Sequence, residues 1–181
     1  MKILIASDMH GDAEATRQII ENYDKLGCNK LLLLGDILYH GPRNNLPEAY
    51  SPKEAIGLLN ERAADIIAVK GNCDADVEGM VLSFPIESYY HILYPDGLTV
   101  FVTHGHKFNT GMPPRINNGY ILLHGHTHIP TIERFGDGNV YINPGSVSMP
   151  KLNNPKTFAV YENRTFTIYE IDGTVFDSIT L

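Results

Sequence analysis

Short apolar segments and longer amphipathic segments alternate along the first half of the chain. One amphipathic segment runs from an expected N-cap at Asp12 to Leu26. The other begins at Ser51-Pro52-Lys53-Glu54, which we interpret as a capping box with proline in the first turn. The short apolar runs, expected to form buried strands, are Lys2–Ser7, Leu31–Leu34 and Ile66–Val69. The resulting β-α-β-α-β order predicts a parallel sheet with right-handed crossovers.

The second half consists of strand-like runs separated by turn sequences. Pro95-Asp96-Gly97 and Gly136-Asp137-Gly138 each separate two such runs, which predicts a β-hairpin at both places. No linker or repeat interrupts the chain, so we expect one α/β domain over residues 1–181, with two stacked sheets and helices outside. The expected strands are Tyr89–Tyr94, Leu98–Thr103, Tyr120–Leu123, Thr131–Phe135, Val140–Asn143, Thr157–Tyr161, Thr165–Ile171 and Val175–Leu181.

Composition and charge narrow the range of functions. The 181 residues are 43 % hydrophobic and 19 % charged, which suits a globular protein with a core and not a disordered chain. The formal net charge is −7, so the chain lacks the broad positive field that attracts DNA or anionic lipid. A small substrate therefore fits better than bulk nucleic acid.

Cysteine content and hydropathy indicate a compartment. The two cysteines, Cys28 and Cys73, are too few for a disulfide framework or a cysteine-based zinc site and are compatible with a reducing environment. The N-terminus becomes polar at Ser7-Asp8, too early for a signal peptide, and no apolar run is long enough to cross a bilayer. We expect a cytoplasmic protein without a membrane partner, and a homo-oligomer stays open.

Five of the expected strands end in a cluster of polar residues. In an open α/β sheet the carboxyl ends of the strands meet at one edge, where ligands bind, so clusters far apart in the sequence would converge. Glycines within the clusters permit tight turns and close backbone approach. The clusters are Ser7-Asp8-Met9-His10, Gly35-Asp36, Gly71-Asn72-Cys73-Asp74, Thr103-His104-Gly105-His106 and His124-Gly125-His126-Thr127-His128.

These clusters contain seven candidate metal ligands. Side chains two residues apart on an extended chain point the same way, so each Asp-x-His or His-x-His pair can serve one ion. Imidazole, carboxylate and amide donors without thiolate suit Mn²⁺, Fe²⁺ or Zn²⁺. Seven ligands are too many for one tetrahedral ion and suit a binuclear centre with ions about 3.5–4 Å apart, if one carboxylate bridges. The candidates are Asp8, His10, Asp36, Asn72, His104, His126 and His128.

This ordered series resembles the signature of the calcineurin-like metallophosphoesterase superfamily. The resemblance runs from Ser7 to His128, and Asn143-Pro144-Gly145-Ser146 is also similar to a segment of that family. Within the superfamily, the short chain, Cys73 and the run Tyr39-His40-Gly41-Pro42-Arg43-Asn44 resemble the small YfcE-like phosphodiesterases. The resemblance implies an α/β fold with four layers, αββα, in which helices flank a double β-sandwich.

The resemblance also implies a cofactor and a reaction. Two divalent ions per chain are expected, Mn²⁺ first, with Zn²⁺, Fe²⁺ or Ni²⁺ as alternatives. They would lower the pKa of a bridging water, so that hydroxide attacks a small phosphodiester. The implied ligands are Asp8, His10 and His128 for one ion, Asn72, His104 and His126 for the other, and Asp36 for both.

The source of the proton for the leaving group stays open at this point. Many relatives have histidine, the usual candidate acid, where this chain has Cys73. A thiol with an ordinary pKa of about 8.5 is a poorer acid near pH 7 than imidazolium. Either His106 or a metal-bound water supplies the proton, or the enzyme prefers substrates with acidic leaving groups.

Three further polar residues have weaker assignments. Arg43 and His40 lie in the loop after Asp36 and are candidate substrate contacts, Arg43 through a phosphate oxygen. The alternative for Arg43 is an ordinary solvated loop arginine. Asp74 is expected to support its turn and not to bind metal.

Three functions agree with this pattern. The first is a metal-dependent phosphodiesterase acting on small substrates. The second is a nuclease of the same superfamily, which the acidic charge and the absence of a DNA-capping domain disfavour. The third is a non-catalytic scaffold resembling the retromer subunit of similar size, which would need none of the seven ligands. The complete ligand set favours the first.

Overall fold

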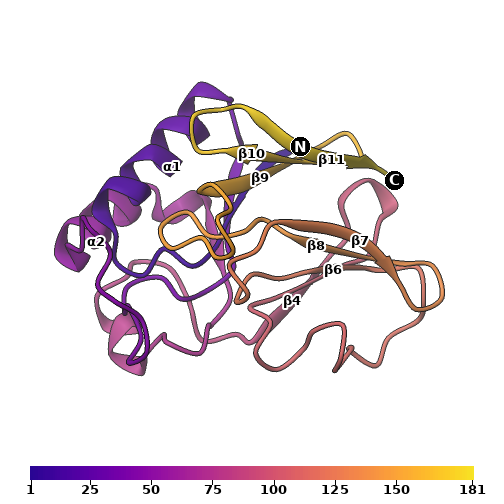
Figure 1. Cartoon of the computed structure of the whole chain (residues 1–181), viewed down its shortest axis with the longest axis horizontal. Coiled ribbons are helices and arrows are strands. Elements are labelled where there is room, and N and C mark those ends of the chain that lie inside the picture. The colour runs from indigo at the N-terminus through magenta and orange to yellow at the C-terminus, as the bar shows by residue number, and fades with distance from the viewer.

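Two mixed β-sheets pack face to face in the computed structural model, which describes residues 1–181 (Figure 1). The strand order is β11-β10-β9-β1-β2-β3 in the six-stranded sheet and β4-β5-β6-β8-β7 in the five-stranded sheet. The first sheet contains β1 (Lys2–Ala6), β2 (Lys30–Leu33), β3 (Ile66–Ala68), β9 (Thr157–Glu162), β10 (Thr165–Glu170) and β11 (Val175–Thr180). The second contains β4 (Tyr90–Leu93), β5 (Val100–Thr103), β6 (Ile121–Leu123), β7 (Thr131–Phe135) and β8 (Asn139–Asn143).

The predicted β-α-β-α-β half is confirmed. Strands β1, β2 and β3 are parallel, and α1 (Ala13–Lys25) and α2 (Pro52–Asn60) connect them. Asp12 caps α1, because its Oδ1 accepts a hydrogen bond from the Ala15 N–H at 2.9 Å. The capping box predicted at α2 is wrong: Ser51 makes no side-chain capping bond, and Glu54 pairs instead with Arg17 of α1.

The strands predicted in the second half also form. Both hairpins are present, β4 with β5 and β7 with β8, and β9 to β11 form an antiparallel meander. The meander joins the first sheet, because β9 pairs antiparallel with β1. In the second sheet β5, β6 and β8 run parallel. Each sheet therefore contains a parallel block of three strands.

Alternate side chains of the strands build two cores. Leu4 of β1 faces α1 and α2, whereas Ile5 faces the second sheet, as the two-residue period of a strand requires. The two helices lie together on the outer face of the first sheet (Figure 1). On the outer face of the second sheet, Phe108 and Ile116 of the irregular segment 104–120 cover an aromatic cluster. The predicted sandwich is confirmed, with this segment in place of a helix on that face.

The longest helix, α1, has 13 residues, and none of the helices has both the length and the apolar character required to cross a bilayer.

Candidate metal centre

Hydrogen bonding between the backbones of neighbouring loops continues beyond the ends of β1 and β2. The Asp8 N–H donates to the Gly35 carbonyl at 3.2 Å, and the His10 N–H donates to the Asp36 carbonyl at 2.9 Å. The candidate ligands on these loops are therefore fixed side by side at the carboxyl edge of the sheet. Parallel strands β5 and β6 bring the histidines that follow them to the same place.

Five of the seven candidate ligands have left-handed backbone conformations. For a residue other than glycine this conformation costs of order 1–3 kcal/mol, although Asp and His tolerate it better than most. Such strain persists where the surrounding structure fixes it and concentrates at functional sites. The φ angles are 56° for Asp8, 50° for His10, 54° for Asp36, 67° for His126 and 61° for His128.

Two glycines allow the strand ends to approach closely. A Cβ atom on Gly71 would overlap the Asp36 carboxylate. A Cβ atom on Gly125 would lie 2.6 Å from Asp8 Oδ2 and would overlap Ser7. Any larger residue at either position would displace a candidate ligand.

The first group of ligands consists of Asp8, His10 and His128. The Nδ1 atoms of His10 and His128 lie 2.8 Å and 2.6 Å from the carbonyls of Tyr39 and Met149, so both nitrogens must donate. Their Nε2 atoms then carry lone pairs, and these face each other at 3.4 Å. Asp8 Oδ1 is buried without a hydrogen-bond partner, 3.3 Å from His128 Nε2. Three electron-pair donors thus face one point, which a cation fits.

The second group consists of Asp36, His104 and His126, with Asn72 beside them. His104 Nδ1 donates to the Leu34 carbonyl at 2.7 Å, which turns Nε2 toward the site. This Nε2 lies 3.0 Å from Asn72 Oδ1, 3.2 Å from His126 Nδ1 and 3.4 Å from Asp36 Oδ2. The four side chains again converge on one point.

Asp36 lies between the two groups. Its Oδ1 accepts a hydrogen bond from the Cys73 N–H at 2.8 Å, which orients the carboxylate. Its Oδ2 is 3.8 Å from His10 Nε2 and 3.4 Å from His104 Nε2. A carboxylate in this position can contact an ion in each group.

Ionisation in the site also suits metal ions. Burial alone would raise the pKa of Asp8 and Asp36, yet contacts with histidines hold both below their usual range. Burial lowers the pKa of His10 and His126, which leaves both rings neutral. Burial acts on His104 in the same direction, but its contact with Asp36 and the charge of Asp8 raise its pKa to about 9. His104 therefore carries a positive charge next to the two carboxylates. A divalent ion bound here would supply positive charge in its place and displace the His104 proton.

A layer of hydrogen bonds fixes Asp8 from behind. Its Oδ2 accepts bonds from the Ser7 hydroxyl at 2.7 Å and the His126 N–H at 2.9 Å. Its carbonyl accepts bonds from the hydroxyls of Ser146 and Ser148 at 2.9 and 2.8 Å. The segment around Ser146, noted in the sequence for its resemblance alone, therefore positions a candidate ligand.

Asp74 supports its turn, as predicted. Its carboxylate accepts hydrogen bonds from the N–H groups of Asp36, Ile37 and Gly71, at 2.9, 2.7 and 2.7 Å. Glu78 lies beside it and is also buried. Burial, together with the charge of Asp74, raises the pKa of Glu78 to about 8. Burial and the charge of Asp36 also raise the pKa of Asp74, but the N–H groups of Ile37 and Gly71 oppose this shift and favour its ionised form. Of the two carboxyl groups, Glu78 therefore holds the proton near pH 7.

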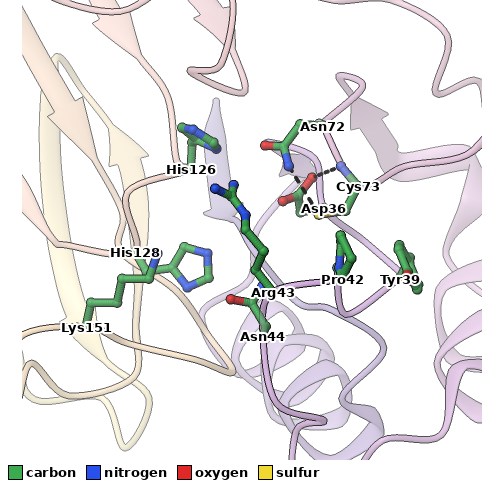
Figure 2. A pocket seen from close by; sticks show the side chains of 11 residues that line it. Asp36, Tyr39, Pro42, Arg43, Asn44, Asn72, Cys73, His126, His128 and Lys151 are labelled. Carbon is green, nitrogen blue, oxygen red and sulfur yellow. Dashed lines mark hydrogen bonds between the residues drawn. The ribbon is translucent and has the colours of Figure 1, made fainter.

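A cavity of about 480 Å³ opens onto the ligands (Figure 2). Arg43 lies in the middle of this view, with its guanidinium turned toward His126 and Asp36. Lys151, which sequence reasoning missed, lies beside His128 on the opposite side from Cys73. The lining residues are Asp36, Tyr39, Gly41, Pro42, Arg43, Asn44, Asn72, Cys73, His126, His128 and Lys151.

Two predicted residues do not line the cavity. The His40 ring packs edge-on against the rings of Tyr39 and Tyr50, with centroid distances of 4.7 and 5.4 Å. The His106 ring lies 5.5 Å from the His104 ring, and its buried Nδ1 has no hydrogen-bond partner. Each therefore lies next to the site without lining the cavity: His40 packs against Tyr39 of the lining and His106 against the candidate ligand His104.

Neither candidate acid is suited to donate a proton at pH 7. Burial and the charge of Asp36 raise the pKa of the Cys73 thiol to about 12, which makes it a very weak acid. Burial and the charge of His104 lower the pKa of His106 to about 4, so its ring carries no proton to spare. The cavity wall therefore presents a neutral thiol at position 73, which is a poor proton donor for a leaving group.

Comparison with known proteins agrees with this fold. The profile of the calcineurin-like phosphoesterase superfamily domain matches residues 1–165. The chain belongs to the calcineurin-like phosphoesterase superfamily, which confirms the predicted family and enzyme class and implies divalent metal binding.

Within this family the similarity is high to one characterised enzyme. The phosphodiesterase YfcE of Escherichia coli K12 is 41 % identical over 172 residues, covering 95 % of this chain and 93 % of that protein. The solved structure of Escherichia coli YfcE, a phosphoesterase, superposes with a TM-score of 0.96 at 39 % identity over 99 % of both chains. The predicted YfcE-like branch is confirmed. Vps29 of Entamoeba histolytica, solved with Zn²⁺, shares the fold with a TM-score of 0.62 at 19 % identity, over 99 % of this chain and 98 % of that one.

Proposed function

We propose that this protein is a binuclear-metal phosphodiesterase that hydrolyses small phosphodiesters by attack of metal-activated hydroxide. The observation that carries the proposal is the position of Asp36 Oδ2 between two groups of donors whose lone pairs face inward. The phosphodiesterase activity named for YfcE, at 41 % identity, supports the choice of reaction.

Two divalent ions, with Mn²⁺ the expected one, would supply Lewis-acid charge and a nucleophile from water at neutral pH. The residues of the chain orient and bind. Backbone carbonyls fix the tautomers of His10, His104 and His128. The proposed ligands are Asp8, His10 and His128 in one group, Asn72, His104 and His126 in the other, and Asp36 between them.

Substrate contacts follow from the cavity. Arg43 points at the space in front of the ligands and can donate to a non-bridging oxygen of the scissile phosphate. Because neither Cys73 nor His106 suits proton donation at pH 7, the departing oxygen must carry much of its own charge. Substrates with acidic leaving groups are therefore favoured.

Size and charge favour a small substrate over a nucleic acid. The cavity of about 480 Å³ is lined by the loops that follow β2, β3, β6 and β8, and its volume suits a small molecule. The chain carries a net charge of −7, which opposes binding of a long polyanion. We propose a cytoplasmic enzyme acting on small molecules.

The binuclear centre is tested by Asp36→Asn. Asparagine can still accept the Cys73 N–H bond, so the fold should persist, while the negative charge shared by both groups is lost. We expect fewer than two Mn²⁺ ions bound per chain and loss of turnover of bis(p-nitrophenyl) phosphate, with an unchanged circular dichroism spectrum. Asp177→Asn, at an exposed carboxylate of β11, is the control. Near wild-type turnover and two bound ions in Asp36→Asn would refute the proposal.

A further inference from the structure

We infer that Lys151 recognises a second anionic group on the substrate, separate from the scissile phosphodiester. This inference rests on the proposed function and adds a substrate class to it: phosphodiesters with a further phosphate or carboxylate in one ester arm. Lys151 is held at the rim of the cavity by its backbone, and no carboxylate of the chain pairs with it.

Lys151 is attached through its backbone to a candidate metal ligand. The Lys151 N–H donates to the His128 carbonyl at 3.2 Å, while His128 Nδ1 donates to the carbonyl of Met149 at 2.6 Å. The segment containing Lys151 thus contacts both the backbone and the ring of His128. The Lys151 side chain starts at a fixed place on the rim and runs beside His128 (Figure 2).

A strained turn follows Lys151 directly. Leu152 and Asn153 both have left-handed conformations, with φ of 55° and 59°, and the Leu152 side chain is 79 % exposed. Packing of the Leu152 side chain therefore does not account for this unusual backbone conformation. The turn closes on Lys151 itself, because the N–H and side-chain amide of Asn154 both donate to its carbonyl, at 3.2 and 2.8 Å. These bonds fix the backbone from which the Lys151 side chain extends along the cavity.

The charges around the cavity leave Lys151 without a partner. Asp36 is the one acidic residue of the lining, and its carboxylate already faces the metal ligands. Neither Arg43 nor Lys151 forms an ion pair within the chain, although Lys70 and Lys156 do. In a chain of net charge −7, two unpaired cations in one cavity indicate an anionic ligand.

A simple phosphodiester would not satisfy both cations. Its scissile phosphate carries one negative charge, and that charge lies in front of the metal ligands, where Arg43 points. Lys151 lies to one side, next to His128. Lysine presents a compact charge with several rotatable donors, which suits a terminal phosphate or carboxylate that can move at the rim.

The test compares p-nitrophenyl phosphodiesters that differ only in the end of the second ester arm: a hydroxyl, a carboxylate or a phosphate. The measured quantity is the ratio of kcat/KM for each anionic ester to that for the hydroxyl ester, on Mn²⁺-loaded protein. We expect wild type to prefer at least one anionic ester by about tenfold, the size of one charge-assisted hydrogen bond. The preferred anion distinguishes a phosphate from a carboxylate substrate.

Lys151→Met should reduce this ratio to near one, Lys151→Arg should keep most of it, and Lys151→Glu should bring it below one. Lys53→Met, at an exposed lysine of α2 outside the cavity, is the matched control and should keep the wild-type ratio. The wild-type preference should also weaken at high salt, because the contact is exposed.

Three results overturn the inference. One is a wild-type ratio near one for both anions while the hydroxyl ester is hydrolysed. The second is an equal loss on all three esters in Lys151→Met, which would place Lys151 at the scissile phosphate. The third is a preference that Lys151→Glu leaves unchanged. Failure of the proposed function is different and recognisable, because then wild type with Mn²⁺ hydrolyses none of the esters.

Discussion

Replacing Asp74 by asparagine changes the hydrogen bonds that hold the loops of the metal ligands, while every proposed ligand stays in place. Asp74 Oδ2 accepts the N–H groups of Asp36 and Gly71, and Oδ1 accepts that of Ile37. An asparagine has one oxygen, so in either orientation its NH₂ group faces at least one backbone N–H. One or two buried donors then lose their partner.

The expected cost follows from these bonds. A hydrogen bond to a charged group contributes about 1.5–3 kcal/mol, and a buried donor left unpaired costs a similar amount. In the less costly orientation the amide oxygen faces the N–H groups of Asp36 and Gly71, and only the bond from the Ile37 N–H is lost. We therefore expect Asp74→Asn to lower the free energy of unfolding by about 2–4 kcal/mol, and the melting temperature by about 5–15 °C for a domain of this length.

Urea denaturation of chelator-treated protein at pH 6.5 measures this change, at a pH where Glu78 keeps its proton. The control is Asp76→Asn, whose carboxylate is 98 % exposed and pairs only with Lys70; its effect should stay within about 0.5 kcal/mol. Because Asp74 also fixes the backbone of Asp36, Mn²⁺ affinity should fall by about 10–100-fold in Asp74→Asn. Stability and affinity both equal to wild type would refute the view that Asp74 fixes these loops.

Other changes address Glu78, the metal ions and Cys73. Burial raises the pKa of Glu78 from 4.5 to about 8. Between these two pH values the unfolded chain releases a proton that the folded chain keeps. The free energy of unfolding should therefore decrease as the pH rises from about 4.5 to about 8. Glu78→Gln should flatten this fall in urea titrations, and an unchanged slope would contradict the assignment. Mn²⁺ added to chelator-treated protein should raise its melting temperature and support turnover at least equal to that with Mg²⁺, because imidazole ligands favour the later metal; a strict Mg²⁺ requirement would count against the ligand set. Cys73→His should reduce the dependence of kcat/KM on leaving-group acidity, with a general-acid contribution of about 10²–10⁴-fold on poor leaving groups; a dependence as steep as in wild type would show that position 73 does not reach the leaving oxygen.

Strand positions and the candidate ligands were predictable because each depends on short-range pattern. The apolar run before Asp8 ends where the polar cluster begins, and β1 does end there, at Ala6. The grouping of ligands came from the family resemblance, and the structure places the same side chains together. Asp74 was correctly expected to support its turn, because it lies three residues after Gly71 and its carboxylate accepts the Gly71 N–H.

The remaining features depend on contacts that no local pattern contains. Lys151 reaches the cavity only because its loop pairs with His128, 23 positions earlier in the chain. Glu78 meets Asp74 because a 3-10 turn over Asp76–Met80 folds it back, and an isolated glutamate gives no sign of burial. The capping box at Ser51 failed because Glu54 found a charged partner on the neighbouring helix, and a tertiary contact took the place of a local one.

The left-handed conformations of the ligand loops limit which amino acids this site can adopt over evolutionary time. Asp, Asn, His and Gly tolerate such a backbone, whereas glutamate and β-branched residues are strained in it. Substitutions at His10 or Asp36 can therefore exchange one short polar donor for another, or delete the donor with glycine, with little backbone cost. Metal preference, and catalysis itself, can then change by single steps while the sandwich beneath stays folded.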